Sequence, residues 1–175
     1  MITLQELNAL GESEFVTLVG PVFEGSPWVA ERTWPTRPFE GIDDLRDSLC
    51  QRVYEANEEE KLALIRAHPD LAGRAAREGA LTPESTAEQA GAGLDRLADE
   101  EFAPFSRMNE DYRARFGFPF VICVGENTKE SILASFAARL ENDREREVET
   151  ALAEVCKIAR LRLCDLVVTP AEEHA

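Results

Sequence analysis

HPDLAGRAAREGALTPESTAEQ, residues 68–89, is the stretch around which the rest of the sequence is arranged. The helical pattern that precedes it must end at His68, because Pro69 disfavours the α conformation in the residue before it. Thr82 followed by Pro83 then makes a good N-cap and first position for another helix. The stretch therefore predicts the end of one helix, a short irregular connection and the start of the next helix.

Helical spacing of apolar residues continues on both sides of this stretch. We expect two short helices within 1–20, a short one at 28–32, and longer ones at about 43–55, 58–67, 83–97, 100–116, 128–141 and 144–168. Residues 70–82 are expected to be irregular, or to contain one weak turn at 75–77. The prolines, glycines and aromatic residues of 21–41 predict a structured flap on the core.

Only one stretch has the composition of a strand. GFPFVICVG, residues 117–125, is apolar, rich in β-branched residues and bounded by glycine. Since no second such run exists to pair with it, we expect an extended buried segment instead of a sheet. The predicted fold is all-α, a single irregular bundle of about eight helices. It forms one domain over residues 1–175, with a mobile tail at 172–175.

The composition is that of a soluble globular protein with a strong acidic excess. Of the 175 residues, 34 are acidic and 19 are basic, which gives a formal net charge of -15. Such a polyanion lacks the excess of Lys and Arg through which proteins bind nucleic acid or anionic membranes. It also repels anionic small molecules, so a site for an anion needs its own cation.

The sequence shows no membrane or targeting segment. No apolar run reaches the 18 residues that a transmembrane helix requires. The N-terminus, MITLQELNALGESEF, lacks a basic region followed by an apolar one. The four cysteines show no CxxC spacing, which fits reduced thiols packed as small apolar groups. These features predict a cytoplasmic protein.

His68 is the first candidate for chemistry. Its imidazole is the side chain best suited to proton transfer near neutral pH. The other histidine, His174, lies in the charged C-terminal tail. A histidine at a helix end also has a purely structural use, since it can cap carbonyl groups and interact with the helix dipole. Both interpretations stay open from this residue alone.

Ser85, Glu88 and Gln89 form a second candidate group. Their i, i+3, i+4 spacing places them on one face near a helix N-terminus, where free N–H groups favour an anion. Ser85 and Glu88 also match the S-x-x-E capping box, a common structural motif. The spacing alone does not decide between a site and a cap.

The C-terminal helix supplies a cation. In steps of 100° per residue from Val148, the apolar residues Leu152, Val155, Ala159, Leu163 and Leu166 fall on one face. Arg162 falls within this apolar face, whereas Arg160 falls on the polar side. A guanidinium is too costly to bury alone. Arg162 therefore predicts either a structural salt bridge or a fork that binds a ligand carboxylate or imide.

Other classes of site have little support. His68, Asp70 and Glu88 are candidate metal ligands, but one usable histidine without tight ligand spacing does not predict a metal site. The sequence contains no GxGxxG, P-loop or GxSxG motif. We therefore predict no metal and no nucleotide cofactor.

Several segments together resemble one family. They are HPDLAGR at 68–74, LTPESTAEQAGAGL at 81–94, NEDYRARFGFPFVICVG at 109–125 and KIARLRL at 157–163, with LNALGESEFVTLVGPVFEGSPWVAER at 7–32 and RPFEGIDDL at 37–45 nearer the N-terminus. In this order, and over nearly the whole chain, they resemble 2-oxo-4-hydroxy-4-carboxy-5-ureidoimidazoline (OHCU) decarboxylase of urate degradation. HPDLAG joined to S-x-x-E-Q is far more specific than either motif alone.

The resemblance implies a fold, an activity and a set of site residues. The family is all-α, works without cofactor or metal, forms (S)-allantoin from OHCU with loss of CO2, and includes homodimers. His68 and Glu88 match its catalytic pair. The positions that match its substrate contacts are Pro69, Ser85, Gln89 and Arg162, with the backbone of the 118–122 segment, including Phe120, Val121 and Ile122. We therefore expect a homodimeric carboxy-lyase that acts on OHCU.

The implied chemistry explains why no cofactor motif is needed. The substrate's own conjugated ring can accept the electrons that loss of CO2 leaves behind, so orientation and preorganised charge suffice. His68 would be the acid/base, Glu88 would assist it, and Arg162 would bind substrate oxygen. The order of the proton transfers stays open. Two alternatives are a non-catalytic helical binding or scaffold module, and an enzyme of the same fold acting on another ureido acid.

Overall fold

The computed structural model describes residues 1–72 and 81–168. Within these ranges the chain forms nine α-helices, which are α1 (Leu4–Ala9), α2 (Glu12–Val19), α3 (Trp28–Thr33), α4 (Ile42–Glu55), α5 (Glu58–Ala67), α7 (Pro83–Gly91), α8 (Asp99–Phe116), α9 (Lys129–Arg139) and α10 (Arg144–Leu166). The predicted all-α fold of about eight helices is confirmed. The weak turn predicted at 75–77 and the tail at 172–175 lie outside the described residues.

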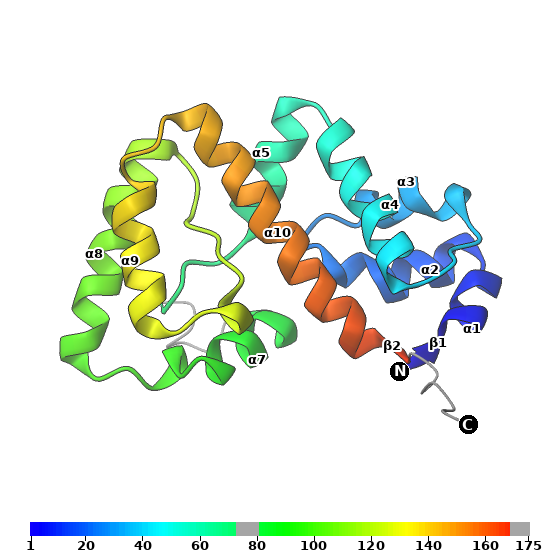
Figure 1. The fold of residues 1–175 in the computed structure, drawn as a ribbon, viewed down its shortest axis with the longest axis horizontal. Coiled ribbons are helices and arrows are strands. Elements are labelled where there is room, and N and C mark those ends of the chain that lie inside the picture. The colour runs from blue at the N-terminus through cyan, green and yellow to red at the C-terminus, as the bar shows by residue number, and fades with distance from the viewer. Residues whose placement is uncertain (73–80, 169–175) are drawn as a thin grey trace, which may run out of the picture.

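Helix α10 runs across the molecule and packs against α4 and α5. In Figure 1, α1 to α4 gather on one side of it, and α8 and α9 lie on the other. Asp143 begins the helix as its N-cap, accepting a hydrogen bond from the N–H of Arg146 at 2.8 Å. Leu152, Val155 and Leu163 are buried, as the predicted apolar face requires.

Two helix ends position the central stretch of the sequence. Helix α5 ends at His68, whose backbone is extended (φ -72°, ψ 139°) because a proline follows it. Helix α7 begins at Thr82, whose hydroxyl accepts a hydrogen bond from the N–H of Ser85 at 3.3 Å, with Pro83 in the first turn. The helix end and the helix start predicted from the sequence are both confirmed.

Helix α7 is shorter than the sequence predicts. We expected it to reach about residue 97, but it ends at Gly91. The chain then turns through Gly93, at φ 71°, into a short 3-10 helix, η3 (Leu94–Arg96). Glycine adopts this left-handed conformation without the steric cost that a Cβ brings. The glycines of QAGAGL therefore stop a helix that apolar spacing alone predicts to continue.

Residues 117–123 form the segment that the composition predicts, buried from Phe118 onward, and the 3-10 helix η4 (Val124–Glu126) follows. A buried side chain holds the segment from behind. Arg139 on α9 donates a hydrogen bond to the carbonyl of Val121 at 2.7 Å and pairs with Glu147 on α10, with Nε at 2.6 Å from Oε1. Since Arg139 and Glu147 are both buried, this pair fixes the backbone of the segment.

One small feature has no counterpart in the predictions. Strand β1 (Ile2–Thr3) pairs in parallel with β2 (Val167–Val168), which brings the first residues of the chain beside the end of α10 (Figure 1). Strands of two residues are too short to show the alternation by which strands are recognised in a sequence. The all-α description is otherwise unchanged.

Candidate active site

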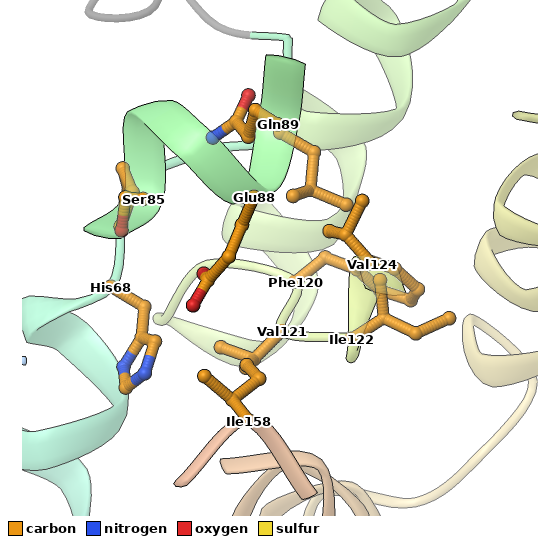
Figure 2. Close-up of a pocket in the computed structure, with 11 residues that line it drawn as sticks. His68, Ser85, Glu88, Gln89, Phe120, Val121, Ile122, Val124 and Ile158 are labelled. Carbon is orange, nitrogen blue, oxygen red and sulfur yellow. The ribbon is translucent and has the colours of Figure 1, made fainter. Parts of the chain in front are cut away.

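A small cavity lies where the end of α5, helix α7, the 117–123 segment and α10 meet (Figure 2). Its volume is about 30 Å³, enough for one or two water molecules. It is lined by eight of the nine predicted site residues, namely His68, Pro69, Ser85, Glu88, Gln89, Phe120, Val121 and Ile122, together with Leu71, Val124 and Ile158. The ninth, Arg162, contacts Glu88 and borders an open hollow between α7 and α10.

His68 presents its imidazole to the cavity from the end of α5. Its Nδ1 lies 3.0 Å from the carbonyl of Leu64. Because a carbonyl can only accept, Nδ1 must carry the hydrogen, and Nε2 of the neutral ring is left with a lone pair. Burial lowers the pKa of His68, and the Leu64 carbonyl and the Glu24 carboxylate only partly oppose this. Burial therefore favours the neutral form of the ring.

The structure excludes the capping-box interpretation of Ser85 and Glu88. The N-cap of α7 is Thr82, so Ser85 and Glu88 do not form a capping box. The carboxylate of Glu88 instead accepts two hydrogen bonds from Arg162. Ser85, Glu88 and Gln89 all line the cavity, as their shared helix face predicts. Figure 2 shows the Glu88 carboxylate extending from α7 toward the side of the cavity where His68 lies.

Arg162 points inward, and its neighbour Arg160 is exposed, as the helical spacing predicts. Two carboxylates hold it at once. Its Nε and Nη2 donate to the two oxygens of Glu88 at 2.6 and 3.0 Å, and its Nη1 donates to Oε2 of Glu24 at 3.1 Å. Nη2 also lies 3.4 Å from the hydroxyl of Ser85. Burial lowers the pKa of Arg162, but the pairs with Glu88 and Glu24 outweigh burial and raise it.

Glu24 is a part of this cluster that the sequence predictions missed. It is buried, and besides Arg162 it accepts hydrogen bonds from the hydroxyls of Thr82 at 2.8 Å and Ser85 at 3.1 Å. Its segment follows no helical or strand period, so spacing gave no reason to select it. A composition signal was present, however, because Glu24 is the only charged residue between Phe15 and Ala30.

The side-chain amide of Gln89 forms hydrogen bonds with the backbone that follows His68. Its Oε1 accepts the N–H of Ala72 at 2.9 Å, and its Nε2 donates to the carbonyl of Asp70 at 3.3 Å. Ala72 has a positive φ of 49°, an uncommon conformation for a residue with a side chain. Gln89 therefore fixes the loop after Pro69 as well as lining the cavity.

The far wall of the cavity is apolar. Phe120, Val121 and Ile122 line it from the extended segment, and Phe120 stacks on Phe136 with ring centroids 3.7 Å apart. The stacked rings and the hydrogen bond from Arg139 to the Val121 carbonyl restrict the movement of this wall. An apolar wall facing charged side chains strengthens their interactions with a bound ligand, because it lowers the local dielectric.

Asp70, considered above as a metal ligand with His68 and Glu88, is engaged elsewhere. It forms an ion pair with Arg113 on α8, with Oδ1 at 2.8 Å from Nε. Glu88 is likewise committed to Arg162. Among the residues that the structure describes, no group of three or more metal-ligating side chains is found.

Known proteins are similar to this chain over nearly its whole length. The family model of OHCU decarboxylase matches residues 8–164. A 2-oxo-4-hydroxy-4-carboxy-5-ureidoimidazoline decarboxylase from Halalkalicoccus jeotgali is 42% identical over 177 residues, covering 99% of this chain and 98% of that protein. The chain belongs to the OHCU decarboxylase family. The family predicted from the sequence is therefore confirmed, and with it the class of enzyme, a decarboxylase.

Two further relatives agree with this assignment. The OHCU decarboxylase of Haloferax volcanii is 44% identical over 164 residues, which cover 94% of this chain and 95% of that protein. A crystal structure of (S)-allantoin synthase superposes with a TM-score of 0.76 at 28% identity, and covers 97% of this chain. The chain spans 55% of the length of that crystallised protein.

Proposed function

We propose that this protein decarboxylates OHCU to (S)-allantoin in urate degradation, without a cofactor. The observation that carries the proposal is that His68 and Glu88 line one cavity, and that Glu88 is held there by Arg162, in a chain of the OHCU decarboxylase family. These residues supply a base, a carboxylate and a cation. These are the groups that an anionic substrate losing CO2 requires.

The reaction places clear demands on the site. When the bond to the carboxylate breaks, its electron pair moves into the conjugated ring and CO2 leaves. The ring nitrogen and the carbon that carries the ureido group each gain a proton, while the hydroxyl loses one and becomes a carbonyl. One proton is therefore consumed for each CO2 released. The protein must orient the carboxylate and move protons to one face of the ring.

His68 is proposed to move these protons. Because Nδ1 is bound to the Leu64 carbonyl, Nε2 is the nitrogen that can accept the proton of the substrate hydroxyl. The imidazolium so formed can then deliver a proton to the ring carbon. The lowered pKa of His68 supports this order, because the free enzyme starts with the base form. A single fixed donor would also give one enantiomer of allantoin.

We propose that the ion pair of Glu88 and Arg162 separates when the substrate binds. A cavity of about 30 Å³ does not hold a molecule the size of OHCU, so side chains must move. Glu88 is the most exposed member of the ionic cluster, with 26% of its side chain accessible, against 7% for Arg162. Glu88 would turn toward the substrate and assist His68, and Arg162 would bind a substrate oxygen with the N–H groups that Glu88 releases.

The other lining residues would shape the site around the substrate. Ser85 and Gln89 carry polar groups on the same face of α7, and Pro69 fixes the chain beside His68. Phe120, Val121 and Ile122 would supply the opposite wall, including backbone groups of the extended segment. We propose these residues as substrate contacts.

The decisive experiment makes the substrate in the assay. OHCU is formed from urate with urate oxidase and hydroxyisourate hydrolase, this protein is added, and (S)-allantoin is followed by circular dichroism. We expect faster decay of OHCU and an optically active product. Decay at the spontaneous rate with a racemic product would contradict the proposal and favour a non-catalytic module or an enzyme for another ureido acid.

Assembly and compartment are proposed from the family resemblance and the sequence. No helix in the described ranges is long and apolar enough to cross a membrane. We propose a cytoplasmic homodimer, for which light scattering after size exclusion would give twice the chain mass of 19.5 kDa. A mass of one chain would contradict the dimer.

A further inference from the structure

Glu24 is buried and accepts three hydrogen bonds in this structure. Its side chain is 7% exposed. Oε1 accepts from the Thr82 hydroxyl at 2.8 Å, while Oε2 accepts from the Ser85 hydroxyl and from Nη1 of Arg162, each at 3.1 Å. One carboxylate thus connects the N-cap of α7, a polar residue of the cavity wall and the buried cation of α10.

The backbone places Glu24 close to the end of α5. Gly25, the next residue, has a φ of 59°, and a Cβ built on it would lie 3.2 Å from the Cβ of Ala67. Glycine suits both this left-handed conformation and the close approach, because a Cβ would be strained and crowded here. Since Ala67 directly precedes His68, the segment that carries Glu24 packs against the helix end that presents the imidazole.

The two carboxylates on Arg162 differ in their other partners. Glu24 is tied to Thr82 and Ser85 as well as to Arg162. Glu88 has both oxygens on Arg162, lines the cavity and is 26% exposed, compared with 7% for Glu24. Glu88 can therefore leave Arg162 without breaking other bonds described for its carboxylate, whereas Glu24 cannot.

We propose that Glu24 is a positioning residue of the active site, the permanent counterion that keeps Arg162 and Ser85 in place while Glu88 is displaced by substrate. This inference rests on the proposed function for the displacement step. The physical reason is the cost of an unpaired buried charge, which is large when one partner of a buried ion pair is removed. With Glu24 in place, Arg162 keeps a carboxylate on Nη1, and its Nε–Nη2 edge is free to receive the substrate.

Glu24 also sets the charge around the imidazole. Three charged groups gather near His68, which are Glu24 before α3, Glu88 on α7 and Arg162 on α10. The negative charge of Glu24 favours the imidazolium, and the positive charge of Arg162 opposes it. A second role for Glu24 follows, since it supports the proton that His68 must carry between the two transfer steps.

The test is Glu24→Gln, which keeps the size and removes the charge. The amide can still accept from Arg162 and Ser85 through Oε1 and donate to the Thr82 hydroxyl through Nε2, so the fold is expected to persist. We expect kcat to fall by about 10²-fold, because a small misplacement of catalytic groups lowers the rate by that order. We expect a smaller change in KM. Glu24→Asp restores the charge, and we expect it to recover part of kcat.

Glu31→Gln is the matched control, because Glu31 is exposed and lies in the same part of the chain. The second readout needs no turnover. Only two histidines are present, so the His68 imidazole can be titrated by NMR with His174 as an internal reference. Glu24→Gln should move the midpoint of His68 to lower pH, whereas Glu31→Gln and Glu24→Asp should leave it near the wild-type value.

The outcomes separate this inference from the proposed function. If the wild-type protein does not convert OHCU, the proposed function fails, and the NMR midpoints still test whether Glu24 acts on His68. Wild-type kcat, KM and His68 midpoint in folded Glu24→Gln would overturn the inference. If Glu24→Gln does not fold, Glu24→Asp decides, because the longer reach to Arg162 should lower its kcat while the His68 midpoint stays unchanged. A wild-type kcat in Glu24→Asp would then contradict the positioning role.

Discussion

Arg162 donates two hydrogen bonds to Glu88, one to each carboxylate oxygen, at 2.6 and 3.0 Å, across 74 positions of sequence. This pair connects α10 to α7 beside the cavity. It neutralises a guanidinium inside the apolar face of α10 and holds a carboxylate beside the imidazole of His68. The salt bridge and the ligand-binding fork were alternatives for Arg162. In the proposed function Arg162 serves as both, because it pairs with Glu88 in the free protein and binds the substrate once Glu88 has moved.

Replacing His68 should abolish most turnover without unfolding the protein. We expect His68→Ala to lower kcat for OHCU by roughly 10² to 10⁴, the usual value of a positioned proton-transfer group. The measurement is the rate of (S)-allantoin formation by circular dichroism on freshly made OHCU. His174→Ala, which removes the other histidine, should behave as wild type. Near-normal, stereoselective turnover by His68→Ala would contradict the assignment of His68 as the proton-transfer residue.

Arg162→Lys should weaken substrate binding even though it keeps the positive charge. A lysine keeps the positive charge but loses the paired N–H groups that meet Glu88 and, in the proposed function, the substrate. We expect KM for OHCU to rise by about tenfold or more, consistent with the loss of one charged hydrogen bond. Arg160→Lys on the exposed side of the same helix is the control. Equal KM values for the two variants would contradict a role in substrate binding.

The sequence predicted those parts of the site that depend on local rules. The proline after His68 determined where α5 ends, and the 100° spacing of α10 placed Arg162 inside. Both rules concern a residue and its own helix. The pairing of Arg162 with Glu88 depends on how α10 packs on α7, which no local pattern contains. The sequence accordingly predicted a buried cation without identifying its partner.

Glu24 and Gln89 show why the rest was not predictable. Glu24 lies in a segment of prolines and glycines, where neither the helical nor the strand period assigns a side chain to the inside. Gln89 was predicted on the correct face of α7, yet its amide also bonds the backbone of Asp70 and Ala72. That use depends on the turn after Pro69, whose course only the folded chain reveals.

The rate should depend on pH through His68. Burial lowers the pKa of His68 below its ordinary 6.5. In the proposed function, the neutral ring is the form that accepts the first proton. Activity should therefore persist as pH falls through 6.5 and decline only at lower pH. The measurement is kcat/KM for OHCU against pH, compared with the NMR midpoint of His68. An acidic limb centred above 6.5 would contradict a buried neutral base.

The same shift predicts how stability changes with pH. Because the folded pKa of His68 is below the unfolded value near 6.5, the unfolded state binds more protons between the two values. The contribution of His68 to the free energy of unfolding thus decreases as pH falls below 6.5, and it is fully present above that pH. Urea denaturation of wild type and His68→Ala across this range measures the difference. A difference independent of pH would contradict the lowered pKa.

Glu147→Gln should destabilise the wall of the cavity from behind. The Glu147 carboxylate is fully buried and accepts hydrogen bonds from Arg139 at 2.6 Å, from Asn142 at 2.8 Å and from the Tyr112 hydroxyl. Breaking a buried ion pair by removing one partner typically costs about 3–5 kcal/mol. We expect a loss of that order in the free energy of unfolding, measured by urea denaturation, whereas exposed Glu149→Gln should change it little.

Glu147→Gln should also lower the kcat for OHCU. Without the charge of Glu147, Arg139 should hold the Val121 carbonyl less firmly, and Val121 lines the cavity. Below the unfolding transition, the folded variant should therefore show a reduced kcat for OHCU together with its reduced stability. A variant that loses stability but keeps the wild-type kcat would show that the extended segment holds its shape without Arg139. In that case the aromatic stacking of Phe120 on Phe136 would be sufficient to position the wall.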